Sequence, residues 1–384
     1  MKIGQISFSS TGGAGTVASR LHKAFVRQNL SSSLIVVTNS NLHADPWRNL
    51  TEVVRGTIDN MLLTSSPNMF SITRSRNGRV GLQELEDYDV IHLHWVEGVV
   101  TTENLRHLAG LGKQIIWTLH DMRPFSGGCH YSGECTQFQI GCGKCPYATS
   151  LGQRLIRDNF AELKRDGLHE RIQFVAPSEW IHNKFMASEL GKNASVTRIF
   201  NPGFGSLGNY QEEIVRIDGE ILIAVAASWT DPRKGLDDLL TAWRMAAPQK
   251  MILNLVGEVD SNLKLPKGVK ALGTRSEDEL AQLLGEATAL VIPSKEENAS
   301  MLISEARTIG VPLVVRSGTG SDSFVHGGVD GYLFADVSEL SNIIGKLERG
   351  LDLSFYKNSQ NLGLDFSPER VAQQYLALYG STKA

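Results

Sequence analysis

Two carboxylates bracket the start of a predicted helix in the C-terminal half of the chain. They are Glu297 and Glu305, and seven residues separate them. An apolar run at 289–292 stops at Pro293, which is how a buried parallel strand ends in a loop. Apolar residues then recur at helical spacing over 301–309, with a glycine as C-terminal stop. The pattern predicts a strand, a polar loop and a helix.

The start of this helix is suited to binding phosphate. In a strand–loop–helix unit the helix N-terminus lies at the carboxyl ends of the strands, and its first N–H groups have no partner inside the helix. We expect the N–H groups near Ser300, Met301 and Leu302 to face an anion. The alternative is that Glu297 and Glu305 are solvated acids on an ordinary helix face.

A second candidate phosphate contact follows the strand predicted at 220–228. Arg233 and Lys234 are adjacent cations, and Gly235 lies next to them at a strand-to-helix turn. Guanidinium and ammonium groups at such a turn favour a diphosphate clamp. The alternative is a pair of surface cations that contribute only to solubility.

In the N-terminal half, a glycine loop and a histidine each follow a predicted strand. Gly12 and Gly13 follow the strand at 2–8, where glycine lets the backbone approach a ligand, although the loop could be only a tight turn. His120 follows the strand at 114–119, so its side chain is expected at a cleft, with a structural role as the alternative.

Two further histidines alternate with apolar residues in the strand predicted at 89–95. His92 and His94 therefore share one face of that strand. No third ligand lies at metal-site spacing, so we expect both side chains to pack inside the domain.

All four cysteines lie within one glycine-rich loop at 127–146, at Cys129, Cys135, Cys142 and Cys145. The last two form a C-x2-C knuckle, and four thiolates suit a tetrahedral structural zinc ion. Such a closed site leaves no open position for catalysis. Four free thiols, or disulfides in an oxidising compartment, are the alternatives.

The composition limits the class of protein. A length of 384 residues exceeds what one hydrophobic core organises, so two domains are expected. A net charge of −3 differs from the basic excess of nucleic-acid-binding proteins, so no nucleic-acid partner is expected. No apolar run reaches the length of a membrane span, and no secretory segment is apparent. We therefore expect a cytoplasmic protein, with peripheral contact at the inner face of the cell membrane left open.

Strands and helices alternate in two series, which predicts two doubly wound, Rossmann-like α/β domains facing a cleft. The expected boundaries are 1–205, 206–366 and a terminal helix at 367–384, with a hinge at about 201–213. An irregular insertion is expected at about 39–86, which either contacts a substrate or covers the sheet edge.

The stretch 293–312 resembles the donor-site motif of retaining glycosyltransferases of family 4 (glycosyl transferases group 1). The resemblance extends over nearly the whole chain and includes Lys234-Gly235 and residues 118–121. The loop at 117–146 is similar to a Cys-rich loop of family 4 enzymes from exopolysaccharide clusters, including the colanic-acid type.

This resemblance implies the GT-B fold, with an acceptor-side domain at 1–205, a nucleotide-sugar-binding domain at 206–366 and a terminal helix that returns to the first domain. It implies retaining, metal-independent transfer of a hexose from a nucleotide-diphosphate sugar. The implied acceptor is a glycan or a polyprenyl-linked oligosaccharide in surface polysaccharide synthesis. No cofactor is expected for catalysis.

The resemblance also implies roles for single residues. His120 would lie beside the transferred sugar, and Glu297 would hold its hydroxyls or the oxocarbenium-like carbon, so both are candidate catalytic residues. Glu305 would hold the ribose hydroxyls. The candidate donor-binding residues are Gly12, Gly13, Arg233, Lys234, Ser300, Met301, Leu302 and Glu305.

Two other functions stay open. A nucleotide-sugar epimerase on the same scaffold would act on the donor without an acceptor. A non-catalytic donor-binding subunit is suggested by Ala299-Ser300, because the family often has an aromatic–Gly pair there, and by the absence of the companion arginine that usually precedes Lys234 by several residues.

Overall fold

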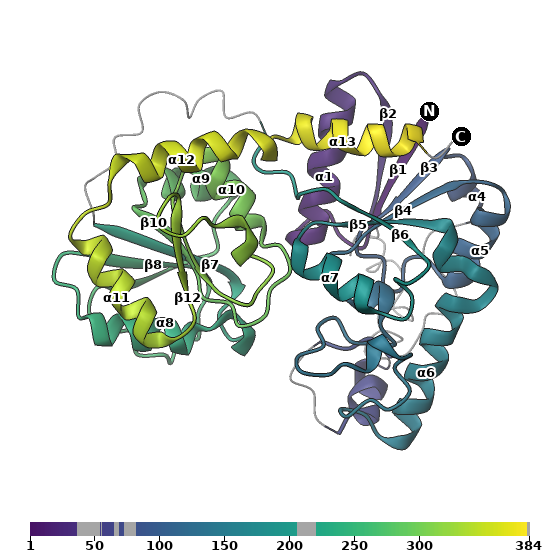
Figure 1. Cartoon of the computed structure of the whole chain (residues 1–384), viewed down its shortest axis with the longest axis horizontal. Coiled ribbons are helices and arrows are strands. Elements are labelled where there is room, and N and C mark those ends of the chain that lie inside the picture. The colour runs from purple at the N-terminus through teal and green to yellow at the C-terminus, as the bar shows by residue number, and fades with distance from the viewer. Residues whose placement is uncertain (37–53, 55, 65–68, 73–81, 206–219, 382–384) are drawn as a thin grey trace. The chain divides into compact units, whose positions relative to one another are not determined.

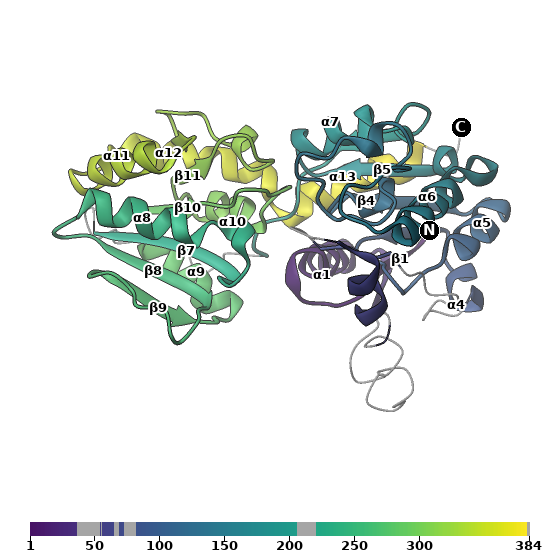
Figure 2. The ribbon, with the colours of Figure 1, turned by 90° about the horizontal axis from the view of Figure 1, so that it is seen from below.

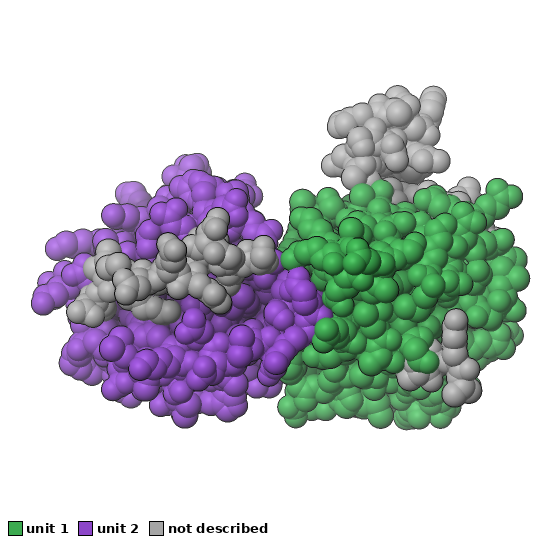
Figure 3. Space-filling view, turned by 90° about the horizontal axis from the view of Figure 1, so that it is seen from above, with its two compact units in different colours: residues 1–200, 372–384 green, residues 201–371 purple. Residues whose placement is uncertain are grey.

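The computed structural model describes residues 1–36, 54, 56–64, 69–72, 82–205 and 220–381. The chain divides into two compact units, Met1–Phe200 with Ala372–Ala384 as unit 1 and Asn201–Val371 as unit 2 (Figure 3). Each unit contains a six-stranded sheet whose strand pairings are all parallel. Most of the expected insertion and hinge lies outside the described residues.

The sheet of unit 1 has the strand order β2-β1-β3-β4-β5-β6. Its strands are β1 (Lys2–Ser7), β2 (Ser31–Val36), β3 (Val90–Leu93), β4 (Gln114–Thr118), β5 (Ile172–Ala176) and β6 (Ser195–Arg198). The inner strands are short apolar runs, as expected where helices cover both faces of a parallel sheet. The strand order reverses at β1 and β3, so residues that follow β1, β3 and β4 gather at one edge.

The helices of unit 1 are α1 (Gly12–Arg27), α4 (Leu82–Glu86), α5 (Thr102–Gly110), α6 (Ser150–Lys164), α7 (Glu179–Ala187) and most of α13 (Pro368–Ser381). Helix α13 lies beside α1 (Figure 1), where the rings of Phe25 and Tyr379 are 5.9 Å apart. Tyr375 and Tyr379 of α13 are buried, and their hydroxyls hydrogen-bond Thr118 at 2.9 Å and His92 at 2.8 Å.

The sheet of unit 2 has the order β12-β11-β10-β7-β8-β9. Its strands are β7 (Ile221–Ser228), β8 (Ile252–Glu258), β9 (Val269–Gly273), β10 (Ala289–Ile292), β11 (Leu313–Arg316) and β12 (Gly331–Phe334). Helices α8 (Leu236–Ala246) and α11 (Val337–Glu348) cover one face (Figures 1 and 2). Helices α9 (Glu277–Glu286), α10 (Met301–Ile309) and α12 (Leu353–Gly363) cover the other. The prediction of two doubly wound α/β sheets is confirmed.

Candidate functional site

Two loops meet in unit 2 where its strand order reverses, between β7 and β10. The turn after β7 carries Lys234, and the loop after β10 carries Glu297. Lys234 Nζ lies 2.7 Å from Glu297 Oε2, and both side chains are largely buried, with 26% and 12% of their surface exposed. Open α/β sheets bind ligands at the carboxyl ends of strands at such a reversal. The structure therefore brings these two predicted residues into one site.

Close backbone packing fixes this pair of loops. Gly235 has a left-handed φ of 71°, and a Cβ there would lie 2.2 Å from the Pro293 carbonyl oxygen. A Cβ on Gly320 would lie 1.7 Å from the Asn298 carbonyl oxygen. The Gly320 N–H also donates to the carbonyl of Glu297 at 2.8 Å. Side chains at these two glycines would displace the loop that carries Glu297.

Helix α10 begins directly after this loop, as predicted. Its N-cap residue, Ser300, makes no side-chain cap hydrogen bond, and the first turn holds no acidic residue. The backbone N–H groups at the start of the helix, including those of Met301 and Leu302, have no partner within it. An anion placed there would meet these donors and the positive end of the helix dipole.

A buried ion pair holds α10 in place. Arg307 is 1% exposed, and its guanidinium lies 3.2 Å from Asp330 and donates to Ser359 Oγ at 3.0 Å. Burial lowers the pKa of Arg307, and Asp330 opposes that effect. Glu305 lies two residues earlier and is itself buried, with 6% exposure. Glu305 is therefore not a solvated acid on a helix face.

The structure places Arg233 differently from Lys234. The Arg233 guanidinium lies 2.6 Å from Asp231 Oδ2, and its backbone N–H donates to Asp231 Oδ1 at 2.9 Å. A diphosphate would have to compete with this carboxylate for Arg233. Lys234 is therefore the stronger of the two candidate clamp residues.

In unit 1, His120 lies directly after β4 and is hydrogen-bonded to a second histidine. His94 Nδ1 lies 3.1 Å from His120 Nε2, and His94 Nε2 donates to the Gln5 Oε1 at 2.7 Å. Because a neutral imidazole carries one N–H, His120 Nε2 is the donor to His94. Burial lowers the pKa of His94 and lowers that of His120 to about 4, so both rings are neutral near pH 7.

The His92 ring packs next to that of His94, and its side chain is fully buried. Its two nitrogens are 2.8 Å from Thr118 Oγ1 and 2.8 Å from the Tyr379 hydroxyl. The rings of His92 and His94 are 4.3 Å apart, and burial lowers the pKa of His92 to about 3. The expected packing role of these two histidines is consistent with their burial, but His94 also contacts His120.

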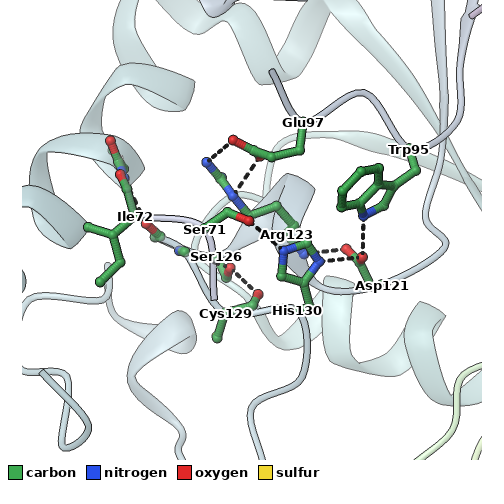
Figure 4. A network of polar contacts seen from close by, with 12 residues as sticks. Ser71, Ile72, Trp95, Glu97, Asp121, Arg123, Ser126, Cys129 and His130 are labelled. Carbon is green, nitrogen blue, oxygen red and sulfur yellow. Dashed lines mark hydrogen bonds and ion pairs between the residues drawn. The ribbon is translucent and has the colours of Figure 1, made fainter. Parts of the chain in front are cut away.

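Asp121, the residue after His120, is buried and points into the Cys-rich loop (Figure 4). Its Oδ2 lies 2.6 Å from His130 Nδ1 and accepts from Trp95 Nε1 at 3.1 Å, while Oδ1 accepts from the Arg123 N–H at 2.8 Å. Burial alone would raise the pKa of Asp121, but His130 and the Arg123 N–H together hold it below its usual range.

A cavity of about 90 Å³ lies beside His120 within unit 1. Trp95, Glu97 and Arg123 line it together with His94 and His120. Arg123 Nε lies 3.0 Å from Glu97 Oε2 (Figure 4). An aromatic ring next to paired charged groups suits a polar ligand such as a sugar.

The two glycines predicted to approach a ligand, Gly12 and Gly13, are the first two residues of α1, the helix that follows β1. Gly12 has a left-handed φ of 74°, and a Cβ on either Gly12 or Gly13 would have no other atom within 4 Å. Both are exposed. Gly15 is the glycine that packing requires, because its Cβ would lie 2.3 Å from the Ser9 carbonyl oxygen.

The four cysteines line one cavity of about 20 Å³, and none of them forms a disulfide. Burial raises the pKa of Cys142 to about 12, although the Gly127 N–H opposes the shift. As the side chains stand, no three His, Cys, Asp or Glu residues among those described are arranged to hold a metal ion. In the parts of the chain that the structure describes, no helix is long and apolar enough to cross a membrane.

Comparison with known proteins shows similarity to one family over part of the chain. Residues 219–349 match the family model described as glycosyl transferases group 1. The putative colanic acid biosynthesis glycosyl transferase WcaC of Escherichia coli is 23% identical over 350 residues, which cover 79% of this chain and 80% of that protein. Residues 219–349 are therefore similar to the glycosyl transferases group 1 family.

Two further likenesses extend this result. The MMP alpha-(1->4)-mannosyltransferase of Mycolicibacterium hassiacum is 29% identical in an alignment over 206 residues, and the match covers 48% of this chain and 46% of that one. The crystal structure of Anabaena Alr3699/HepE in complex with UDP matches 99% of this chain and 100% of that chain, at 17% identity and a TM-score of 0.60. The chain therefore has the GT-B fold.

Sequence reasoning missed two contacts of the Cys-rich loop. Asp121 follows His120 in the sequence, and the structure places its carboxylate against His130 and Trp95. Residues 69–72, within the expected insertion, lie against the Cys-rich loop, where the His130 N–H donates to the Met69 carbonyl at 3.0 Å. The sequence can predict that a polar residue follows a strand, but it does not predict which distant residue its side chain contacts.

Proposed function

We propose that this protein is a retaining hexosyltransferase that transfers a sugar from a nucleotide-diphosphate sugar to a glycan or polyprenyl-linked acceptor. The observation that carries the proposal is the Lys234–Glu297 pair at the strand reversal of unit 2, directly before the N-terminus of α10. Cleavage of a glycosyl diphosphate develops negative charge on the diphosphate and positive charge on the sugar. A cation and helix N–H groups can stabilise the first, and a carboxylate can stabilise the second.

The donor half of the reaction follows from these charges. Departure of the diphosphate develops negative charge on its oxygens, which Lys234 and the N–H groups of Ser300, Met301 and Leu302 would stabilise. Glu297 would face the sugar hydroxyls or the positive anomeric carbon, and Glu305 would accept from the ribose hydroxyls. Family members are generally metal-independent, and these donors are suited to take over the charge neutralisation that a metal ion provides elsewhere.

Unit 1 would supply the acceptor side of the reaction. A neutral His120 is suited to hydrogen-bond a sugar hydroxyl, and its Nε2–H is committed to His94. The cavity with Trp95, Glu97 and Arg123 beside it would take part of the acceptor. The likeness to a protein of colanic acid biosynthesis supports a surface polysaccharide as the product, and with it a polyprenyl-linked acceptor.

The first experiment is a thermal-shift screen of UDP-, GDP- and dTDP-sugars, because a ligand that binds the folded state raises the melting temperature. The donor that stabilises the protein is then incubated with a polyprenyl-diphosphate-linked oligosaccharide, and the anomeric configuration of the product is read by NMR. We expect a product with the donor's configuration. An epimer formed from donor alone, or binding without transfer or hydrolysis, would overturn the proposal.

A further inference from the structure

The geometry points to a zinc site in unit 1, formed by Cys129, Cys135, Cys142 and Cys145. We infer that one ion joins the two halves of the Cys-rich loop and holds its first half against the residues that follow β4. The site would be structural, since four thiolates close the coordination shell of zinc.

The first observation is the common cavity. All four thiols line one space of about 20 Å³, which is enough for a single object the size of a water molecule. Its remaining wall is largely apolar and includes Phe70, Phe138, Tyr147 and Ile156. Such a wall offers little to a bound water, and the thiols are the groups in it that can ligate a soft cation.

The second observation is a set of donors aimed at sulfur. The Gly127 N–H donates to Cys142 Sγ at 3.4 Å. The Tyr147 N–H hydrogen-bonds the Cys145 thiol. Donors of this kind orient metal-bound thiolates and stabilise their charge. A Cβ at Gly127 would lie 2.5 Å from Ile156, so the first of these donors depends on a glycine.

The thiols surround the cavity without converging on one point, since no three potential ligands among the described residues are yet arranged to hold an ion. Metal binding therefore requires the side chains to turn inward until each sulfur is about 2.3 Å from the ion. The cavity at their centre provides the space for that convergence.

The same loop reaches the candidate active site through two contacts (Figure 4). Ser126 Oγ donates to the Cys129 carbonyl at 2.6 Å, and the next residue, His130, bonds Asp121 at 2.6 Å. Asp121 follows His120 directly. The ion would thus fix the backbone that presents His120 without touching substrate.

The test is metal analysis of the full chain, produced with zinc in the medium and purified without chelator. We expect about one zinc per chain, and about one tightly bound Co²⁺ per chain, with a tetrahedral thiolate spectrum, after exchange. Cys142→Ser and Cys145→Ser should lose the metal, while Lys144→Ala, which changes the exposed residue between them, should retain it.

A zinc content near zero with four titratable thiols in the wild-type protein would overturn the inference, as would two disulfides or a bound iron. If the serine variants fail to fold, the wild-type metal content and the Co²⁺ spectrum still decide the matter. Both measurements are independent of sugar transfer, so the zinc site and the proposed function can fail separately.

Discussion

Lys234 Nζ and Glu297 Oε2 lie 2.7 Å apart although 62 residues separate them in the sequence. The pair joins the turn after β7 to the loop after β10, the two strands at the reversal of the unit 2 sheet. A diphosphate bound at α10 would compete with Glu297 for the Lys234 ammonium. Donor binding is therefore expected to release the carboxylate toward the sugar.

Lys234→Ala should weaken donor use strongly, because it removes the cation that we propose stabilises the leaving group. We expect kcat/KM for the donor to fall by about 10²- to 10³-fold, the range seen when one group that stabilises developing negative charge is removed. Steady-state kinetics with varied donor measure the effect. Lys270→Ala, which changes an exposed lysine on β9, is the matched control and should behave as wild type.

Glu297→Gln keeps the shape of the side chain and removes its charge. Turnover should fall by at least about 10²-fold if the carboxylate faces the anomeric carbon. The affinity for the free nucleoside diphosphate should stay the same or rise, because Lys234 no longer has an anionic competitor. Isothermal titration calorimetry measures the affinity for the nucleoside diphosphate. A large loss of this affinity in Glu297→Gln would contradict the proposed role of Glu297 at the sugar.

Glu305→Ala should act mainly on nucleotide binding. A hydrogen bond to a charged group contributes about 1.5–3 kcal/mol, which corresponds to a loss of about 10- to 10²-fold in nucleotide affinity. Because Glu305 is buried, the melting temperature of the variant is measured alongside. Glu305→Gln should retain more nucleotide affinity than the alanine variant. Equal nucleotide affinity of the wild type and both variants would contradict the proposed contact between Glu305 and the ribose.

His120→Asn should lower kcat by about 10- to 10²-fold with little change in donor affinity, because its proposed contact forms at the reacting sugar. Burial lowers the pKa of His120 to about 4, so the wild-type kcat should show no step attributable to this residue between about pH 5.5 and 8. A kcat step near pH 6.5 that disappears in the variant would show a ring that titrates normally, contrary to this expectation.

Acid should destabilise unit 1 through its buried histidines. The pKa values of His92 and His120 are about 3 and about 4 in the folded chain, against 6.5 for an ordinary histidine. The unfolded chain therefore binds more protons over this interval, and stability falls as the pH drops from about 6.5 toward about 3. Melting temperatures across this range measure the slope. His94→Gln should reduce it, and the surface variant His182→Asn should leave it unchanged.

Several elements of unit 2 could be predicted from the sequence because each has a strong local signal, whereas helix α12 (Leu353–Gly363) was not predicted. The apolar run at 289–292 and the helix from Met301 to Ile309 were predicted at their observed bounds. Gly310 ends that helix with a left-handed φ of 84°, as a C-terminal glycine stop should. Patterns of period 2 and 3.6 depend on neighbouring residues and can be read without the fold.

The partners of the polar residues could not be predicted in the same way. Arg307 lies inside the recognised motif, yet its ion pair with Asp330 depends on how β12 and α10 pack. Similarly, His94 was assigned to packing, and its bond to His120, which lies after a neighbouring strand, was not predicted. Long-range contacts of single side chains leave no periodic signal.

Helix α13 has a consequence for how the chain is made. The hydroxyls of Tyr375 and Tyr379 complete the hydrogen bonds of Thr118 and His92 in the middle of the first sheet. Tyr375 and Tyr379 must therefore be synthesised before unit 1, whose strands are made much earlier, can close its interior. A truncation that removes both tyrosines would leave unsatisfied polar groups on β3 and β4, more than 250 residues upstream.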